Sequence, residues 1–110
     1  MEQERLSARA AQIQAHNAGI CLTGYVWRDA RSGDKVCVPP ATRDRSAAEN
    51  RAAASTRQPG GGPYGINTCR QGYVWREAFA GDQICTMPAS RSAAAADNAA
   101  AAARVVPAPG

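Results

Sequence analysis

Large apolar side chains are scarce in this sequence, and long apolar runs are missing. Its 110 residues include one Phe, two Trp and three Tyr, and much of the 45% hydrophobic fraction is alanine. No stretch approaches the roughly 20 apolar residues that a membrane-spanning helix needs, so we expect no membrane span. A unit of about 40 residues with so few large side chains rarely folds on its core alone. Another source of stability is therefore expected.

Histidine and lysine are nearly absent, with His16 and Lys35 the single examples. A zinc site needs close ligand pairs such as Cys-x-x-Cys, whereas the cysteines here stand 16 positions apart, so we expect no metal or cofactor. A cysteine–histidine nucleophile would depend on His16 alone, which is better interpreted as an exposed helix-end residue. We therefore predict no enzyme. Twelve arginines are interspersed with nine acids and form no run, which argues against nucleic acid as a partner.

The clearest positive feature is an internal repeat. The stretch from Cys21 to Asn50 returns 48 positions later as Cys69 to Asn98, with 16 of the 30 positions identical. The shared pattern is Cys-x-x-Gly-Tyr-Val-Trp-Arg, an acid and Ala, then Gly-Asp-x-Val/Ile-Cys. A Pro-Ala-Thr/Ser-Arg element and a run ending in an acid and Asn follow. Such a repeat defines the unit of folding.

Four cysteines occupy matching positions in the two copies, namely Cys21, Cys37, Cys69 and Cys85. In units this small they predict disulfides, and hence an oxidising, extracellular compartment. Closing a loop of about 16 residues would stabilise the folded state by about 3 kcal/mol on the chain-entropy model. The first residues, Met1 to Glu4, are polar and acidic, so no secretory signal is visible. We therefore expect a processed form or a fragment of the secreted protein.

The pairing of the cysteines is open at this point. Repeat symmetry favours one bridge within each copy. A simple hairpin that turns at Ser32-Gly33, however, places Cys37 opposite about Arg28 and leaves Cys21 about 23 Å away on an extended chain. A disulfide needs Cα atoms within about 7 Å. Either the chain doubles back near Gly24, where glycine permits a bend, or the cysteines pair across copies or between molecules.

Each copy is predicted to be a short β-hairpin followed by an alanine-rich helix, which makes the fold class α+β. The strand formers of residues 24–28 and 35–38 flank turn chemistry at residues 31–34. Tyr and Trp share one face of the first strand, while Val and Arg share the other, and one of these faces must be buried. Asp34 and Asp82 are interpreted as turn formers, because one carboxylate per turn is too few for calcium.

Two prolines mark the starts of the predicted helices. Pro40 begins a helix that runs to about Arg57, and Pro88 begins its counterpart, which ends before Pro107. The predicted apolar faces carry almost nothing larger than alanine: Ala47, Ala48 and Ala52 in the first helix, and Ala95, Ala96, Ala99 and Ala103 in the second. Such faces would allow close packing between repeats or between chains.

These elements divide the chain into five segments. They are an N-terminal helix resembling a degenerate half-repeat (1–19), a first module (20–58), a Gly/Pro linker (59–67), a second module (68–104) and an extended tail (105–110). The predicted fold is thus a small, disulfide-stabilised tandem repeat preceded by a helix.

Several residues that recur in both copies are candidate interaction or structural anchors: Tyr25, Trp27, Arg28 and Asn50 in the first, and Tyr73, Trp75, Arg76 and Asn98 in the second. The arginines are interpreted first as structural, each held by a carboxylate or by helix-end carbonyls in place of missing apolar core. The alternative places them in a recognition surface with the aromatic rings. Asparagine is a poor helix-interior residue, so its recurrence predicts a specific hydrogen bond such as a C-cap.

The second copy also carries a resemblance. The string Cys69–Ala78 (CRQGYVWREA), with Gly81-Asp82, Cys85, Pro88 and Arg91, resembles a tandem repeat of an uncharacterised family of secreted bacterial and fungal proteins. The resemblance covers the two copies of the repeat. It implies an extracellular location and a modular build, and it implies no activity.

Two classes of function fit this sequence, of which we expect the first and keep the second as the alternative. The first is a non-enzymatic structural or protein-interaction repeat that stacks on copies of itself or on other extracellular proteins, and that could assemble into a filament. The second is a glycan-binding or cell-wall-binding module in which the Tyr/Trp pairs form a stacking platform. The burial of Trp27 and Trp75 separates the two, because two rings in the core would leave no platform.

Overall fold

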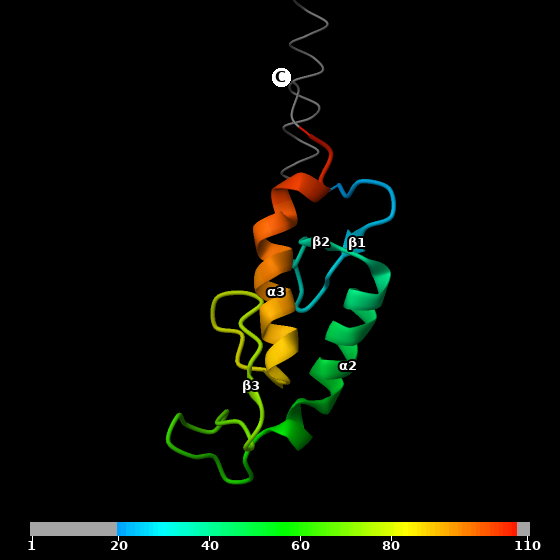
Figure 1. Ribbon diagram of the computed structural model, residues 1–110. Coiled ribbons are helices and arrows are strands. Elements are labelled where there is room, and N and C mark those ends of the chain that lie inside the picture. The colour runs from blue at the N-terminus through cyan, green and yellow to red at the C-terminus, as the bar shows by residue number, and fades with distance from the viewer. Residues whose placement is uncertain (1–19, 108–110) are drawn as a thin grey trace, which may run out of the picture.

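The computed structural model describes residues 20–107 and has an α+β architecture of two small hairpins and two helices (Figure 1). The elements in chain order are β1 (Val26–Trp27), β2 (Cys37–Val38), α2 (Pro40–Thr56), β3 (Val74–Trp75), β4 (Cys85–Thr86), α3 (Pro88–Ala100) and the 3₁₀ turn η1 (Ala101–Arg104). The helix predicted within residues 1–19 lies outside the described residues. No helix in the described part is long and apolar enough to span a membrane.

Both hairpins are antiparallel and pair only two residues per strand. Trp27 lies opposite Cys37 in the first, and Trp75 lies opposite Cys85 in the second. The predicted register, with Cys37 opposite about Arg28, is therefore off by one residue. The reason is that the loop is not a simple two-residue turn, since Asp29 adopts a left-handed φ of 52°. Ladders this short are not stable alone, so each hairpin depends on what surrounds it.

The predicted disulfides are present, one within each copy. They join Cys21 to Cys37 and Cys69 to Cys85, with Cα atoms 5.6 and 5.5 Å apart. The chain reaches this geometry by doubling back at Gly24, whose φ is 94°. Such a φ favours glycine because a side chain there is strained. The within-repeat alternative is the correct one, and the bend resolves the distance problem.

The two halves of the chain bond to each other at matched positions. Arg57 forms an antiparallel bridge with Cys69, and Val105, which follows Arg57 by 48 residues, forms the same bridge with Cys21. The end of the second half therefore returns to the start of the first.

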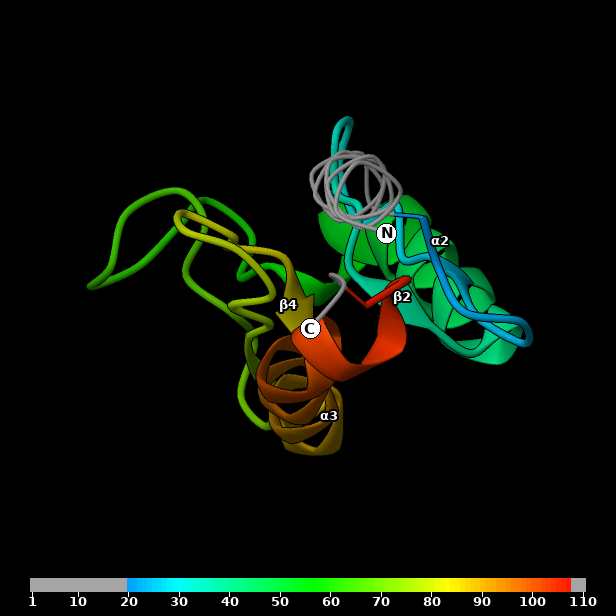
Figure 2. The same cartoon turned by 90° about the horizontal axis from the view of Figure 1, so that it is seen from above.

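The flanking backbone hydrogen bonds repeat this match. The Arg70 amide donates to the Thr56 carbonyl (3.0 Å), and the Leu22 amide donates to the Arg104 carbonyl (2.8 Å). Figure 1 shows the start and end of the described chain side by side at one end of the molecule. Figure 2, seen from above, shows η1 extending from α3 toward β2, where Arg104 donates to the carbonyl of Cys37 (3.2 Å).

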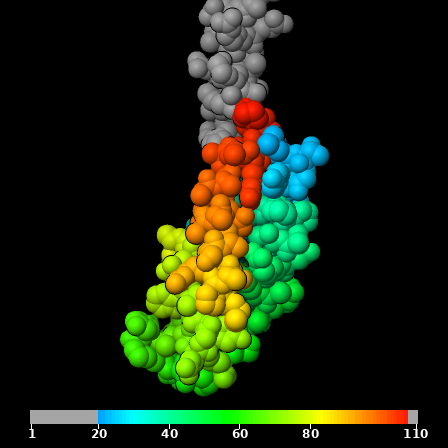
Figure 3. Space-filling view, in the orientation of Figure 1, coloured from blue at the N-terminus to red at the C-terminus, as the bar shows by residue number. Residues whose placement is uncertain are grey.

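The helices α2 and α3 run in opposite directions. In Figure 1 the colour of α2 passes from cyan at the top to green below, whereas that of α3 passes from yellow at the bottom to orange above. Both helices begin at the predicted prolines, Pro40 and Pro88. In the space-filling view of Figure 3, α3 lies directly against residues of the first half.

The inward face of α2 is largely polar and that of α3 mixes alanine with Ser90 and Asp97, so the prediction of which alanines face inward is wrong. Of the seven alanines named for those faces, Ala47 is half-buried and the other six are exposed. The buried helix residues are instead Ser46, Ala94 and Asp97. Alanine favours a helix wherever it lies, so an alanine-rich sequence does not reveal its inner face.

The core of the described residues holds few large apolar side chains. Arg28 and Arg76 are the largest fully buried side chains, each 2% exposed. The apolar cluster of the described residues consists of Ala30, Ala78 and Ala94, with Phe79 packed against it. Disulfides and buried ion pairs therefore supply what the small apolar residues cannot.

Cleavage between the two halves tests this architecture. We expect the unreduced protein, cut at a protease site engineered between Gly60 and Gly61, to stay associated in native buffer. In denaturant without reductant it should separate into two pieces, each lighter by two hydrogens than its reduced form. Native size-exclusion chromatography and mass spectrometry measure both results. Pieces that stay linked in denaturant until a reductant is added would contradict the disulfide pairing.

Candidate functional site

The buried arginines are paired with the aspartates of the hairpin loops. Arg28 donates twice to Asp34, from Nε at 2.7 Å and from Nη2 at 3.2 Å. Arg76 donates in the same way to Asp82, at 2.8 and 3.2 Å. Two-point pairing of this kind is the stronger form of an arginine–carboxylate bond. The structure thus places both arginines as anchors held by a carboxylate.

The sequence indicated that the aspartates form turns. In the structure they also accept further hydrogen bonds. The Asp34 carboxylate also accepts hydrogen bonds from the amides of Ala30 (3.0 Å) and Val36 (3.4 Å). Asp82 makes the equivalent bonds with Ala78 and Ile84. Each carboxylate therefore organises its loop and neutralises the arginine. The signal in the sequence was an aspartate retained in both copies at the same spacing after the arginine.

Each arginine also bonds to the other half of the chain. Arg28 donates to the side-chain oxygen of Asn98 on α3 (2.9 Å) and to the Ala78 carbonyl (3.1 Å). Arg76 donates to the Ser46 carbonyl and to the Glu49 carboxylate on α2, both at 3.4 Å. Each half is thus joined to the other by hydrogen bonds from its buried arginine.

The recurring asparagines make the specific hydrogen bonds that were predicted, but they do not cap helices. Asn50 donates to the Ala30 carbonyl and Asn98 to the Ala78 carbonyl, both at 2.9 Å. Both asparagines lie within their helices, where each ties the helix to the hairpin loop of its own half.

The carboxylate of Asp34 is stabilised in its ionised form. Burial alone would raise its pKa, but the hydrogen bond and charge of Arg28 and the amides of Ala30 and Val36 outweigh burial. The pKa of Asp34 therefore lies below its ordinary value. The ion pair is fully formed at neutral pH as a result.

A second feature recurs in both halves, which is a surface pocket beside each hairpin. The first pocket has a volume of about 370 Å³ and the second about 360 Å³. Five matching positions with identical residues line them: Cys21, Tyr25, Val26, Trp27 and Arg43 in the first, and Cys69, Tyr73, Val74, Trp75 and Arg91 in the second. We call these the first and second aromatic pockets. Both are open depressions of the surface and not enclosed cavities.

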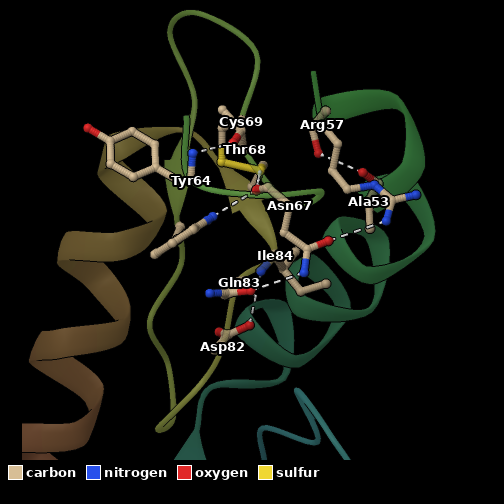
Figure 4. The surroundings of a disulfide bond; sticks show 12 residues. Ala53, Arg57, Tyr64, Asn67, Thr68, Cys69, Asp82, Gln83 and Ile84 are labelled. Carbon is tan, nitrogen blue, oxygen red and sulfur yellow. Dashed lines mark hydrogen bonds between the residues drawn. A yellow bond between two sulfur atoms is a disulfide. The ribbon is translucent and has the colours of Figure 1, made fainter. Parts of the chain in front are cut away.

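The tryptophans of these pockets are not core residues. Trp27 is 40% exposed, and Trp75 is half-buried. The Trp75 ring is held in place because its Nε1 donates to the Asn67 carbonyl (2.8 Å) and the Tyr64 ring packs against it, with an interplanar angle of 72° and centroids 6.1 Å apart. Figure 4 shows Tyr64 and Asn67 near the disulfide of Cys69. Both rings are therefore partly accessible, and Lys35 Nζ lies over the Trp27 ring, 5.1 Å from its centroid.

Charged residues of both signs line the first pocket, and an acid lies near the arginine of the second. Asp29 lines the first pocket together with Arg43. In the second, Arg91 lies 3.9 Å from Glu77, and both side chains are about half exposed. Asp29 and Glu77 adopt left-handed φ angles of 52° and 56°, the only non-glycine residues of residues 20–107 that do so. Strain of this kind is concentrated at functional sites, so its recurrence at both pockets is informative.

The structure separates the predicted residues into two groups. Tyr25 and Trp27 join the pocket, whereas Arg28 points to the core, which excludes a single surface containing all three. The sequence analysis did not include Arg43 and Arg91 as candidates. Their signal was the arginine retained in the Pro-Ala-Thr/Ser-Arg element of both copies.

Comparison with protein-family models, curated proteins and solved structures finds no match to this chain. Within residues 20–107 there is no group of three or more His, Cys, Asp or Glu side chains that could hold a metal ion. His16 lies outside the described residues. Function is therefore inferred from the two aromatic pockets.

Truncation of the arginines distinguishes their roles. Arg28→Ala or Arg76→Ala should lower the free energy of unfolding by about 3–5 kcal/mol, because each leaves a buried aspartate without its partner. Arg43→Ala and Arg91→Ala are matched controls at exposed positions and should change it by less than about 0.5 kcal/mol. Urea denaturation measures all four variants. Equal losses in the two pairs would contradict the anchoring role.

Acid should weaken the fold through Asp34. Because the folded-state pKa is lowered, ionised Asp34 stabilises the fold above the unfolded-state pKa of about 3.9, and this stabilisation is lost as pH falls through the folded-state pKa. Urea denaturation between pH 7 and pH 2 should show this decline. Asp34→Asn should be less stable at pH 7 and flatten the decline, whereas the exposed Asp44→Asn should not. An unchanged slope in Asp34→Asn would refute the assignment.

Proposed function

We propose that this protein is a non-enzymatic extracellular binding module whose two aromatic pockets bind glycan. The observation that carries the proposal is the recurrence of the pocket, with the same Cys, Tyr, Val, Trp and Arg in both halves and nearly the same volume. Packing of the core does not account for the recurrence of the arginine, because Arg43 and Arg91 are exposed.

The chemistry of the pockets favours sugar as the ligand. Trp27 is 40% exposed, and Trp75 is half-buried and fixed by its hydrogen bond to Asn67. An indole ring offers a flat apolar surface to the C–H face of a pyranose. The neighbouring arginine supplies hydrogen-bond donors, and the acid supplies acceptors, for the hydroxyl groups at the edge of the same sugar. Because the arginine and the acid have opposite charges, the pocket favours a neutral glycan over a strongly charged one.

The compartment follows from the cysteines. Two disulfides within a chain this small indicate an oxidising, extracellular-like environment, where polysaccharides of cell walls and matrices are found. The tandem secreted family that the motif resembles would have the same location. The glycan and the compartment are thus consistent with each other.

Self-association is the second candidate function. It is supported by the cross-half bonds of Arg28 and Arg76, since the same bonds could join halves that belong to different chains. In the single chain these bonds are already made internally, so assembly would require an exchange of halves. Molar mass in solution, measured without reductant over a range of concentrations, separates the two. A constant monomer mass favours the glycan-binding proposal, and a rising mass favours assembly.

Sedimentation with polysaccharide particles tests the glycan proposal. We expect the oxidised protein to bind at least one of cellulose, chitin and peptidoglycan, and the double variant Trp27→Ala/Trp75→Ala to lose affinity at least tenfold. Ile66→Ala is the control, because Ile66 is 66% exposed and lines neither aromatic pocket. Circular dichroism and thiol labelling confirm that each variant is folded and oxidised. Binding of none of the three, or equal binding by the double variant, would overturn the proposal.

A further inference from the structure

The two aromatic pockets lie at opposite ends of the molecule. Arg43 is in the first turn of α2, and Arg91 is in the first turn of α3. The two helices are antiparallel, so their first turns point away from each other (Figure 1). A helix of 17 residues is about 25 Å long, which sets the scale of the separation.

The backbone bridges place the pockets in the same way. Cys21, in the first pocket, pairs with Val105, which directly follows the last turn after α3. Cys69, in the second pocket, pairs with Arg57, which directly follows α2. Each pocket therefore lies where one helix begins and the other ends, and the two pockets occupy the two ends of the helix pair.

The connection between the ends is rigid. Each buried arginine bonds the helix of the opposite half, and each hairpin is closed by its own disulfide. The pockets are thus held at a fixed separation and cannot close around one short ligand. A single ligand molecule can occupy both fixed sites only if it is long enough to reach both.

We infer that the protein is a bivalent cross-bridge that binds two separate glycan segments at once, one at each end. This inference rests on the proposed function. It gives the duplicated repeat a function, because a single copy would bind one polysaccharide segment but could not join two segments. A pocket of about 360 Å³ accommodates only a short segment, so each end engages its own stretch of polymer.

Particle agglutination tests the inference, using whichever of cellulose, chitin and peptidoglycan the wild type binds. Wild-type protein should bind the particles and agglutinate them. The single variants Trp27→Ala and Trp75→Ala each retain one pocket, so each should still bind but should fail to agglutinate. Excess single variant should inhibit agglutination by the wild type.

The outcomes separate this inference from the proposed function. Wild type that binds without agglutinating, or single variants that agglutinate as well as wild type, would overturn the cross-bridge and leave glycan binding intact. With a soluble oligosaccharide of the same polymer, calorimetry should give two ligands per chain for wild type and one for each single variant. One ligand per wild-type chain would likewise overturn it. Failure of the wild type to bind at all would overturn both proposals.

Discussion

The fold depends on two buried ion pairs, one in each half of the chain, whose arginines also bond to the other half. Burying a guanidinium and a carboxylate is costly unless nearly every polar atom is bonded, and here the bonds are supplied by loop amides, helix carbonyls and side chains. Those partners come from both halves. In one half alone, the buried arginine would become exposed or would lack some of its hydrogen-bond partners. The two copies are therefore stable together, and the chain closes on itself.

Local features of the sequence were sufficient to predict the elements. Pro40 and Pro88 begin helices because proline suits the first helical position, and the strand formers before each turn do pair. The spacing of Cys21 and Cys37 conflicted with a simple hairpin, and Gly24 indicated the bend that resolves the conflict. Each of these inferences depends on a few neighbouring residues.

Contacts between residues that are far apart in the sequence could not be predicted from such local features. Nothing near Arg28 in the sequence indicates that Asn98 will bond it, and the alanines of α2 and α3 carry no stripe that shows which face turns inward. For the same reason, only some of the residues of the aromatic pockets could be predicted. Tyr25 and Trp27 stood out beside each other, whereas Arg43 joins them only once the helix is placed against the hairpin.

The buried arginines also explain why aromatic rings are at the surface. In a strand, adjacent side chains face opposite sides, so Arg28 points away from the side on which Trp27 lies. A module this poor in apolar residues would ordinarily bury its tryptophan. Here the paired arginine occupies that place and is 2% exposed, which leaves Trp27 40% exposed beside the helix start. The interaction that stabilises the fold is thus the one that makes the rings available for binding.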